Sequence, residues 1–386
     1  MKKIYVDNSS SSFPKAPGVA DVTAAYISEI GCNINRGGYS VSYDAAMEIM
    51  EARKLLADLF KTGDPREVIF TPSITYSLNT LLNGFLNPGD HVITTTMEHN
   101  SVMRPLHHLS KTGVTYDTVK CNETGMLDPT NMIPLIKKET KAIIMLHASN
   151  VCGTVMPVPE VSDICRKYNI RFIVDAAQTA GISEIDASLT DALAFTGHKG
   201  LLGPQGIGGF IIKKDFADEV KPLITGGTGS KSDEYDQPDM LPDKFESGTL
   251  NIPGIIGLKK ATEYIISEGT EKIYKKEMML TSKFVSEVKM IRNVRVIGNI
   301  DDYQNTRYKQ KVAVVSLNFP EHDNAEIAAK LDENYGIMTR CGLHCAPAAH
   351  KTLGTYPHGT VRFSFGYFNS PDDVDQIIHA IKEILK

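Results

Sequence analysis

Two short apolar runs each end in a residue that could do chemistry. The first reads RFIVDAAQ over Arg171–Gln178 and places Asp175 at the carboxyl end of a buried strand, where open α/β sheets keep their ligand sites. The second reads DALAFTGHKGLLGP over Asp191–Pro204 and places Lys199 in a glycine-rich turn beyond a strand. Taken singly, Asp175 could equally cap a helix, and Lys199 could be a solvated loop lysine.

The two residues together favour a cofactor site. Lys199 follows Asp175 by 24 residues, and each lies where a predicted strand ends. Pyridoxal phosphate needs this combination, because an acid keeps its pyridine nitrogen protonated and a desolvated lysine amine binds its aldehyde covalently. We therefore expect an enzyme that uses pyridoxal 5'-phosphate.

The phosphate of such a cofactor needs hydrogen-bond donors. Phe70–Asn79 (FTPSITYSLN) offers the hydroxyls of Ser73 and Thr75 where a strand passes into a helix, whose free N–H groups suit a phosphate. The alternative is a plain capping turn. Met97–Asn100 (MEHN) places His99 after another strand, as an aromatic plate for the pyridine ring, an acid–base group or a structural histidine.

The elements that would position these residues alternate between amphipathic segments and short apolar runs, which is the pattern of βα units and a mainly parallel sheet. Helices are predicted over Asp44–Phe60 and Val158–Tyr168. Strands are predicted over Val68–Thr71, His91–Thr95, Ala142–His147, Ile170–Val174, Leu193–Phe195 and Gly208–Ile212. The polar stretch Gly226–Phe245 is interpreted as either a functional loop or a mobile segment.

A smaller α+β part is predicted to follow. It begins with one long helix over Ile255–Val288 and closes with a helix over Pro371–Leu385. Strands are predicted between these helices over Val294–Ile297, Val312–Phe319 and Val361–Phe365.

The composition is that of a soluble globular protein, with 42% hydrophobic and 23% charged residues among 386. The 41 basic and 46 acidic side chains give a net charge of −5, which indicates neither a nucleic acid nor a membrane surface as partner. The six cysteines contain no metal-type C-x-x-C pair and are too sparse for a disulfide scaffold. We therefore expect no metal site and a reducing, cytoplasmic location.

Six short motifs occur in order along the chain: MEHN, HASNVCGT, VDAAQ, TGHKGLLGPQGIGG, FESGTLN and RCGLHCAP. With these motifs the chain resembles the class V aminotransferase family of pyridoxal phosphate enzymes, in particular its cysteine desulfurase and selenocysteine lyase branch. The resemblance runs from Asn35-Arg36-Gly37 to Arg362. It implies fold-type I, a large domain with a mostly parallel seven-stranded sheet and a smaller α+β C-terminal domain. We place the large domain at residues 15–255 and the small one at 256–386 together with 1–14.

The resemblance also implies roles for individual residues. Lys199 would form the covalent bond to the cofactor, and Asp175 would contact its pyridine nitrogen. Gln178 would contact its ring hydroxyl, and His99 would stack on its ring. The phosphate would be held by Thr75, Thr196 and His198, near Ser73. Thr249 would reach the phosphate of the other protomer, which implies a homodimer with a shared cofactor site.

On the substrate side, the resemblance assigns binding to Asn150 and Arg362, with Arg362 clamping an α-carboxylate as a bidentate fork, while Arg340 helps to order the site. Cys345 stands where this branch keeps its catalytic cysteine, although a free cysteine is more often a small buried hydrophobe. His344 and Arg340 are expected to favour its thiolate. Cys341, four residues earlier, could resolve an oxidised sulfur or be an unrelated loop cysteine.

The predicted function is conversion of L-cysteine to L-alanine with a persulfide left on Cys345, in which Lys199 and His99 are the other catalytic residues. The alternatives are a selenocysteine lyase acting on L-selenocysteine, an ordinary class V aminotransferase and a catalytically idle scaffold. A sulfur or selenium acceptor protein is a candidate partner, although Gly226–Phe245 is shorter and more polar than its counterpart in the desulfurases that feed iron–sulfur assembly, which argues against a dedicated acceptor.

Overall fold

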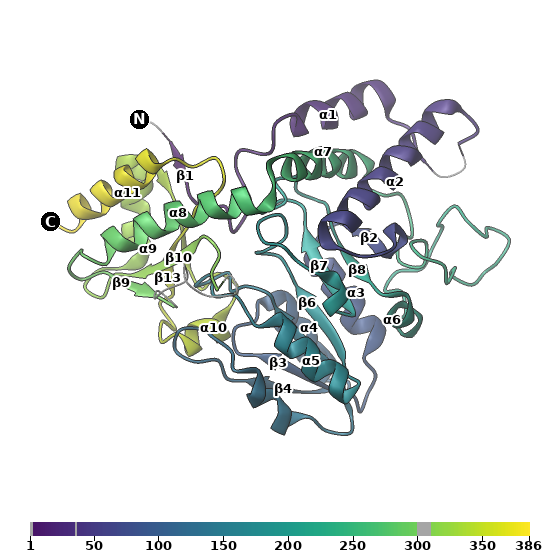
Figure 1. The fold of residues 1–386 in the computed structure, drawn as a ribbon, viewed down its shortest axis with the longest axis horizontal. Coiled ribbons are helices and arrows are strands. Elements are labelled where there is room, and N and C mark those ends of the chain that lie inside the picture. The colour runs from purple at the N-terminus through teal and green to yellow at the C-terminus, as the bar shows by residue number, and fades with distance from the viewer. Residues whose placement is uncertain (1–2, 35–36, 299–309) are drawn as a thin grey trace.

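A seven-stranded sheet lies at the centre of the larger part of the chain (Figure 1). The computed structural model describes residues 3–34, 37–298 and 310–386, so Asn35 and Arg36 of the family resemblance lie outside the described residues. The strands are β2 (Val68–Thr71), β3 (His91–Thr95), β4 (Thr115–Val119), β5 (Thr140–Leu146), β6 (Arg171–Asp175), β7 (Ala192–Thr196) and β8 (Gly208–Ile212). Their order is β2-β8-β7-β6-β5-β3-β4, with β8 antiparallel to both neighbours and the other pairs parallel. The predicted mostly parallel seven-stranded sheet is confirmed.

Alternate residues of the central strands pack into two cores, one on each face of the sheet. In β5, Ile143 and Met145 belong to one core, and Ala142 and Ile144 belong to the other. Neighbouring side chains on a strand point to opposite faces, so a strand covered on both faces reads as an unbroken apolar run. The strand β4 (TYDTV) lies at the sheet edge with only Val119 buried, and it lacks the apolar run that predicted the other strands.

Helices cover both faces of the sheet. Residues of α2 (Ser40–Phe60), α5 (Val158–Tyr168) and α7 (Ile252–Glu268) contribute to the first core, together with α1 (Val19–Ala25) and the π-helical turn η1 (Tyr26–Ile30). Residues of α3 (Ile74–Phe85), α4 (Asn100–Ser110) and α6 (Lys214–Glu219) contribute to the second. Short 3-10 turns lie at η2 (Pro65–Glu67), η3 (Pro129–Leu135) and η4 (Ala187–Leu189).

The C-terminal part forms a second, antiparallel sheet with its own core. Its strands, in spatial order, are β12 (Arg340–Gly342), β13 (Thr360–Ser364), β10 (Val314–Asn318) and β9 (Arg295–Ile297). Its helices are α8 (Thr270–Val288), α9 (Asn324–Tyr335), α10 (Pro347–Thr352) and α11 (Pro371–Ile384). The N-terminal strand β1 (Ile4–Tyr5) pairs with β11 (Ile337–Met338), and Ile4 and Val6 join the core of this part.

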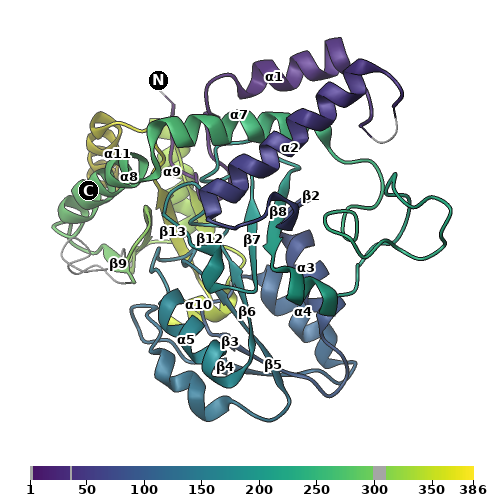
Figure 2. The same cartoon turned by 45° about the vertical axis from the view of Figure 1, so that its right-hand side comes forward.

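The predicted single helix over Ile255–Val288 is wrong. Two helices, α7 and α8, meet at Gly269, whose φ of +83° is a backbone conformation that glycine adopts without strain. Helix α7 packs beside α1 and α2 (Figures 1 and 2). The predicted domain boundary between residues 255 and 256 falls inside α7, and the division of the chain into these two domains stays a prediction.

The stretch Gly226–Phe245 contains neither helix nor strand and extends away from the sheet beyond α6 (Figure 1). Across residues 3–34, 37–298 and 310–386, none of the helices combines the length and the apolar character that a membrane span requires.

Candidate active site

Asp175 is the last residue of β6 and is almost fully buried, at 4% exposure. Its Oδ1 accepts a hydrogen bond from the backbone N–H of Ala177 at 2.9 Å. Burial raises the pKa of Asp175, while the Ala177 N–H and the nearby Lys199 act in the opposite direction. Turns follow the strand, so the interpretation of Asp175 as a helix N-cap is wrong.

Lys199 lies in a turn three residues beyond the end of β7. Burial lowers the pKa of Lys199 to about 8; Asp175 opposes this change, whereas the positive charges of Arg362 and Arg340 contribute to it. Its amine is therefore desolvated, unlike that of an ordinary loop lysine. The fold therefore brings Lys199 near enough to Asp175, Arg340 and Arg362 for their charges to change its pKa.

His99 is the residue before α4 and is held in one orientation. Its Nδ1 accepts the Ser101 backbone N–H at 3.1 Å and lies 2.8 Å from the Ser101 hydroxyl. Burial, aided by the charges of Lys199 and Arg340, lowers the pKa of His99 to about 4. At neutral pH the ring is uncharged, and its proton is on Nε2 because Nδ1 accepts the backbone hydrogen bond.

The residues predicted to hold a phosphate gather where α3 meets the ends of β7 and β8. Ser73 caps α3 and accepts the Tyr76 N–H, and Thr75 lies in the first turn. A Cβ on Gly208 would lie 3.3 Å from the Ile74 backbone nitrogen, which shows how closely the helix start approaches β8. At the end of β7, Thr196 Oγ1 and His198 Nδ1 are buried and have no hydrogen-bond partner among the described residues. Burial lowers the pKa of His198 to about 4.

Arg362 and Asn150, the residues predicted to bind the substrate, contact each other directly. Arg362 is 1% exposed, and its Nη1 donates to the backbone oxygen of Asn150 at 3.0 Å. Asn150 in turn donates through Nδ2 to the backbone oxygen of His344 at 2.7 Å. Asn150 Oδ1 and Arg362 Nε are buried without a hydrogen-bond partner in the described part of the chain. Both atoms are thus available to a ligand.

The N-terminal segment supplies two site residues that the sequence analysis missed. Asp7 Oδ1 lies 2.6 Å from Arg362 Nη2, and Ser10 Oγ accepts from Arg362 Nη2 at 2.7 Å and from Arg340 Nη1 at 3.0 Å. An acid, an asparagine and four serines directly after the apolar Ile4–Val6 were the available signal.

Cys345 is exposed, and two residues from the part of the chain with the seven-stranded sheet hold its loop. The Asn100 N–H donates to the Cys345 backbone oxygen at 2.8 Å, and Asn150 binds the preceding carbonyl. His344 and Cys345 have φ values of +48° and +58°, which are strained for side chains other than glycine. Arg340 Nη2 lies 3.4 Å from the sulfur. The strained loop therefore presents an accessible thiol beside a positive charge.

The expectation that His344 favours the thiolate by its charge is wrong. Its ring is buried, and Nε2 is hydrogen-bonded to the Thr360 hydroxyl at 3.0 Å. Burial and the nearby Arg362 lower the pKa of His344 to about 2, so the ring is neutral. Arg340 is the positive group that contacts the sulfur.

Cys341 faces away from this site. Arg340 and Cys341 are neighbours on β12, so their side chains point to opposite faces of the strand. Cys341 packs against the core of the C-terminal part, and burial raises the pKa of its thiol. This arrangement favours the interpretation of Cys341 as a bystander.

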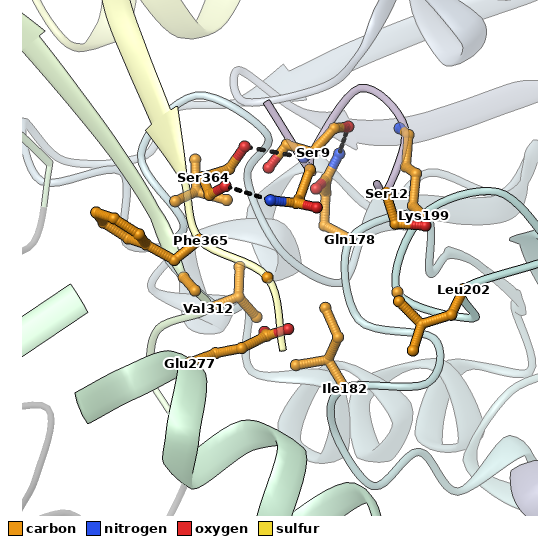
Figure 3. A pocket seen from close by; sticks show the side chains of 15 residues that line it. Ser9, Ser12, Gln178, Ile182, Lys199, Leu202, Glu277, Val312, Ser364 and Phe365 are labelled. Carbon is orange, nitrogen blue, oxygen red and sulfur yellow. Dashed lines mark hydrogen bonds between the residues drawn. The ribbon is translucent and has the colours of Figure 1, made fainter. Parts of the chain in front are cut away.

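Two further predicted site residues differ in their exposure to solvent. Gln178 is buried and donates through Nε2 to the Ser9 backbone oxygen at 3.2 Å, near Lys199 (Figure 3). Thr249 is exposed in the segment before α7, where it is accessible to another molecule. Its predicted contact to a second protomer stays a prediction.

A cavity of about 30 Å³ lies between Lys199 and α8 (Figure 3). Glu277 lines it, is 4% exposed, and has no hydrogen-bond partner for Oε2 within the described residues. Burial raises the pKa of Glu277 to about 8. The cavity has room for about two water molecules, which suits the unpaired Oε2 of Glu277.

The set of groups fits pyridoxal phosphate. Unpaired Thr196 and His198 atoms lie beside a helix N-terminus, as a phosphate requires, and the desolvated Lys199 amine lies near the buried acid Asp175. The unpaired Asn150 and Arg362 atoms suit an amino-acid carboxylate. Within the described residues, no group of three or more His, Cys, Asp and Glu side chains is arranged to hold a metal ion.

A mostly parallel sheet with an acid and a desolvated lysine at its carboxyl edge, completed by a smaller antiparallel part, defines a fold-type I α/β protein. Residues 4–377 match the family Aminotransferase class-V, and the chain belongs to that family.

Named relatives and solved structures agree with this membership. The chain is 34% identical over 388 residues to a Methanothermobacter thermautotrophicus protein named "Probable cysteine desulfurase", covering 99% of this chain and 94% of the relative. It is 30% identical to a cysteine desulfurase of Haloferax volcanii, covering 98% and 88%. The apo structure of a cysteine desulfurase from Thermococcus onnurineus superposes with a TM-score of 0.90 at 33% identity, covering 99% of this chain and 94% of that one.

Proposed function

We propose that the protein is a pyridoxal phosphate-dependent cysteine desulfurase that converts L-cysteine to L-alanine and keeps the sulfur as a persulfide on Cys345. The observation that carries the proposal is the placement of one exposed thiol. The Cys345 loop is bonded to Asn100, the neighbour of His99, and to Asn150, and the sulfur lies 3.4 Å from Arg340, which shares Ser10 with Arg362. A transaminase would have no use for this thiol, whereas sulfur transfer requires a nucleophile there.

When bound, pyridoxal phosphate would supply an electron sink for the negative charge that develops at the substrate Cα. Lys199 would hold it, and Asp175, Gln178 and His99 would contact its ring. Its phosphate would be held by the α3 N-terminus together with Ser73, Thr75, Thr196 and His198. The unpaired buried atoms at Thr196 and His198 support this assignment.

The chain's own groups account for proton and sulfur transfer. A lysine with a pKa lowered to about 8 by burial is partly uncharged near neutral pH, so Lys199 can accept the Cα proton. His99, neutral with its proton on Nε2, can donate one. The Cys345 thiolate attacks the substrate sulfur, so that an S–S bond forms as the C–S bond breaks. The electron pair of the C–S bond stays on the carbon, which takes up a proton, and the product is alanine.

Substrate binding is assigned to Arg362 and Asn150. The unpaired Arg362 Nε and Asn150 Oδ1 would meet the carboxylate and amino group of the amino acid. Arg340 lies at the sulfur end of the site, where it donates to Cys345. L-Selenocysteine would fit the same contacts, so a selenocysteine lyase is the alternative activity.

The active form is proposed to be a homodimer. Exposed apolar side chains occur on η1 and α2 and include Ile27, Ile30, Tyr43, Met47 and Met50. Apolar side chains exposed in this way suit burial against a second copy of the chain. Thr249, exposed beside α7, would then contribute to the partner's cofactor site.

The dimer is tested by mixing two impaired variants. Thr249→Ala should weaken cofactor retention, and mixing it with Lys199→Ala should restore part of the activity through hybrid dimers, as measured by alanine release. A fully active monomer in sedimentation would contradict the shared site.

The activity is tested with purified protein supplied with pyridoxal phosphate and either L-cysteine or L-selenocysteine. Alanine, sulfide and selenide are measured with a thiol reductant standing in for an acceptor protein. We expect alanine and sulfide from cysteine. Alanine from selenocysteine alone would favour the lyase, and no visible absorption from bound cofactor would exclude both.

The free state of all six cysteines is compatible with the proposed cytoplasmic location.

A further inference from the structure

The Ser10 hydroxyl joins three charged side chains. It donates to Asp7 Oδ1 at 2.8 Å and accepts from Arg362 Nη2 at 2.7 Å and from Arg340 Nη1 at 3.0 Å. A serine hydroxyl has one proton to donate and two lone pairs with which to accept. All three are used here, so Ser10 is a saturated junction between two arginines and an acid.

The segment around Ser10 is fixed from both parts of the molecule. The Ser9 N–H donates to Ser364 Oγ at 2.9 Å, and Gln178 donates to the Ser9 backbone oxygen at 3.2 Å (Figure 3). The Ser12 N–H donates to the His198 backbone oxygen at 2.8 Å. The junction is therefore held in place by its backbone, independently of the arginines that it contacts.

The two arginines bound to Ser10 serve different ends of the site. Arg362 donates to Asn150 and keeps Nε unpaired, at the end assigned to the substrate carboxylate. Arg340 donates to the Cys345 sulfur, at the end assigned to sulfur transfer. Each guanidinium is planar and rigid, so a bond at one nitrogen fixes the direction of the others.

We propose that Ser10 is a positioning residue that sets both arginines at once: it aims Arg362 at the substrate carboxylate and Arg340 at the Cys345 sulfur. This inference rests on the proposed function. One N-terminal hydroxyl then affects both substrate affinity and thiol reactivity. Ser10 produces both effects without contacting the substrate.

The test compares Ser10→Ala with Ser10→Thr, which keeps the hydroxyl, and with Ser286→Ala, an exposed serine on α8 that serves as the control. KM for L-cysteine is measured on the enzyme loaded with pyridoxal phosphate. The rate at which iodoacetamide alkylates Cys345 is measured separately by peptide mass, in the absence of substrate. Thermal unfolding and cofactor absorption report whether each variant is intact.

Ser10→Ala should raise KM about tenfold, because a hydrogen bond to a buried charged group is lost. It should slow alkylation of Cys345 about threefold, because the Arg340–sulfur contact is partly exposed and weaker. Ser10→Thr and Ser286→Ala should stay within about twofold of the unsubstituted protein in both measurements. Ser10→Cys, which preserves size but accepts hydrogen bonds poorly, should repeat both losses if the alanine variant does not fold.

A change in only one of the two measurements, or equal losses in Ser10→Thr, would overturn the joint role. The alkylation measurement needs no turnover. If the unsubstituted protein does not act on cysteine, the proposed function fails, while unchanged alkylation in Ser10→Ala is what refutes the role of Ser10.

Discussion

The two halves of the candidate site are built in opposite ways. The sheet edge, consisting of Asp175, Thr196, His198 and Lys199, follows buried parallel strands, and its ionisable groups have pKa values shifted by burial. The cysteine segment, Arg340–Cys345, begins as the antiparallel strand β12 and ends in an exposed thiol on strained backbone.

The difference separates two kinds of chemistry. A group that must hold or move a proton benefits from desolvation, which sets its pKa. A nucleophile that must pass sulfur onward has to remain accessible, so few contacts fix it and its backbone bears the strain. Substitutions in the sheet edge should therefore stop every reaction, and substitutions in the cysteine segment should stop sulfur transfer alone.

The largest effect is expected for Lys199→Ala. Loss of the buried amine should reduce turnover of cysteine and selenocysteine by at least about a thousandfold, because both covalent attachment and proton transfer are removed. Thermal unfolding should change little, because the residue lies in a turn. Substantial residual activity together with normal cofactor absorption would contradict the role of the sheet edge.

Cys345→Ala should lower kcat for cysteine about a hundredfold or more, while cofactor absorption remains. Selenocysteine turnover should survive in part, because a selenol is more acidic and leaves more readily. Cys341→Ala is the matched control and should retain both activities, since that thiol packs into the core of the C-terminal part. Mass analysis after a cysteine pulse should find the extra sulfur on Cys345.

Arg362→Lys should raise KM for cysteine about tenfold or more, because an ammonium group cannot reproduce the planar fork. Arg166→Lys, an exposed substitution on α5, is the control. Equal KM values in the two variants would show that the carboxylate binds elsewhere.

The last expected effect concerns stability and its pH dependence, and leaves the chemistry of both halves unchanged. Burial raises the pKa of Glu277 to about 8 in the folded protein, against 4.5 in the unfolded chain, so the folded state binds more protons between these values. At low pH Glu277 is protonated in both states and does not reduce the free energy of unfolding. As the pH rises through that window, the group lowers the free energy of unfolding. Glu277→Gln should therefore increase the free energy of unfolding by about 2 kcal/mol at pH 9 and change it little at pH 4, measured in urea.

Glu326→Gln, at an exposed position on α9, provides the comparison for this pH dependence. A stabilisation of Glu277→Gln that is the same at both pH values would mean that burial does not raise the pKa of this carboxyl group.

The strands were predictable where both faces are buried, because unbroken apolar runs such as β6 and β8 leave no other placement. The edge strand β4 was not, since its exposed polar residues carry no such signal. The break at Gly269 was missed because the apolar pattern of α7 continues into α8.

Within the site, Asp175 and Lys199 were predicted from the sequence because Asp175 ends a strand and Lys199 lies three residues beyond the end of another. Asp7 and Ser10 were missed, since their partners Arg340 and Arg362 lie more than 300 positions away and local patterns carry no information about such pairs. The neutral state of His344 depends on burial, which sequence neighbours do not reveal.

The bonds between the first residues and β13 also set an order of assembly. Ser9 and Ser364, joined by a hydrogen bond, are separated by 355 positions. During synthesis the N-terminal serines leave the ribosome long before the strand that carries Arg362 exists, although the large sheet can already form. The part of the candidate site that contains Arg362 is therefore completed only after β13 (Thr360–Ser364) has been synthesised, and chains that stop before β13 lack it.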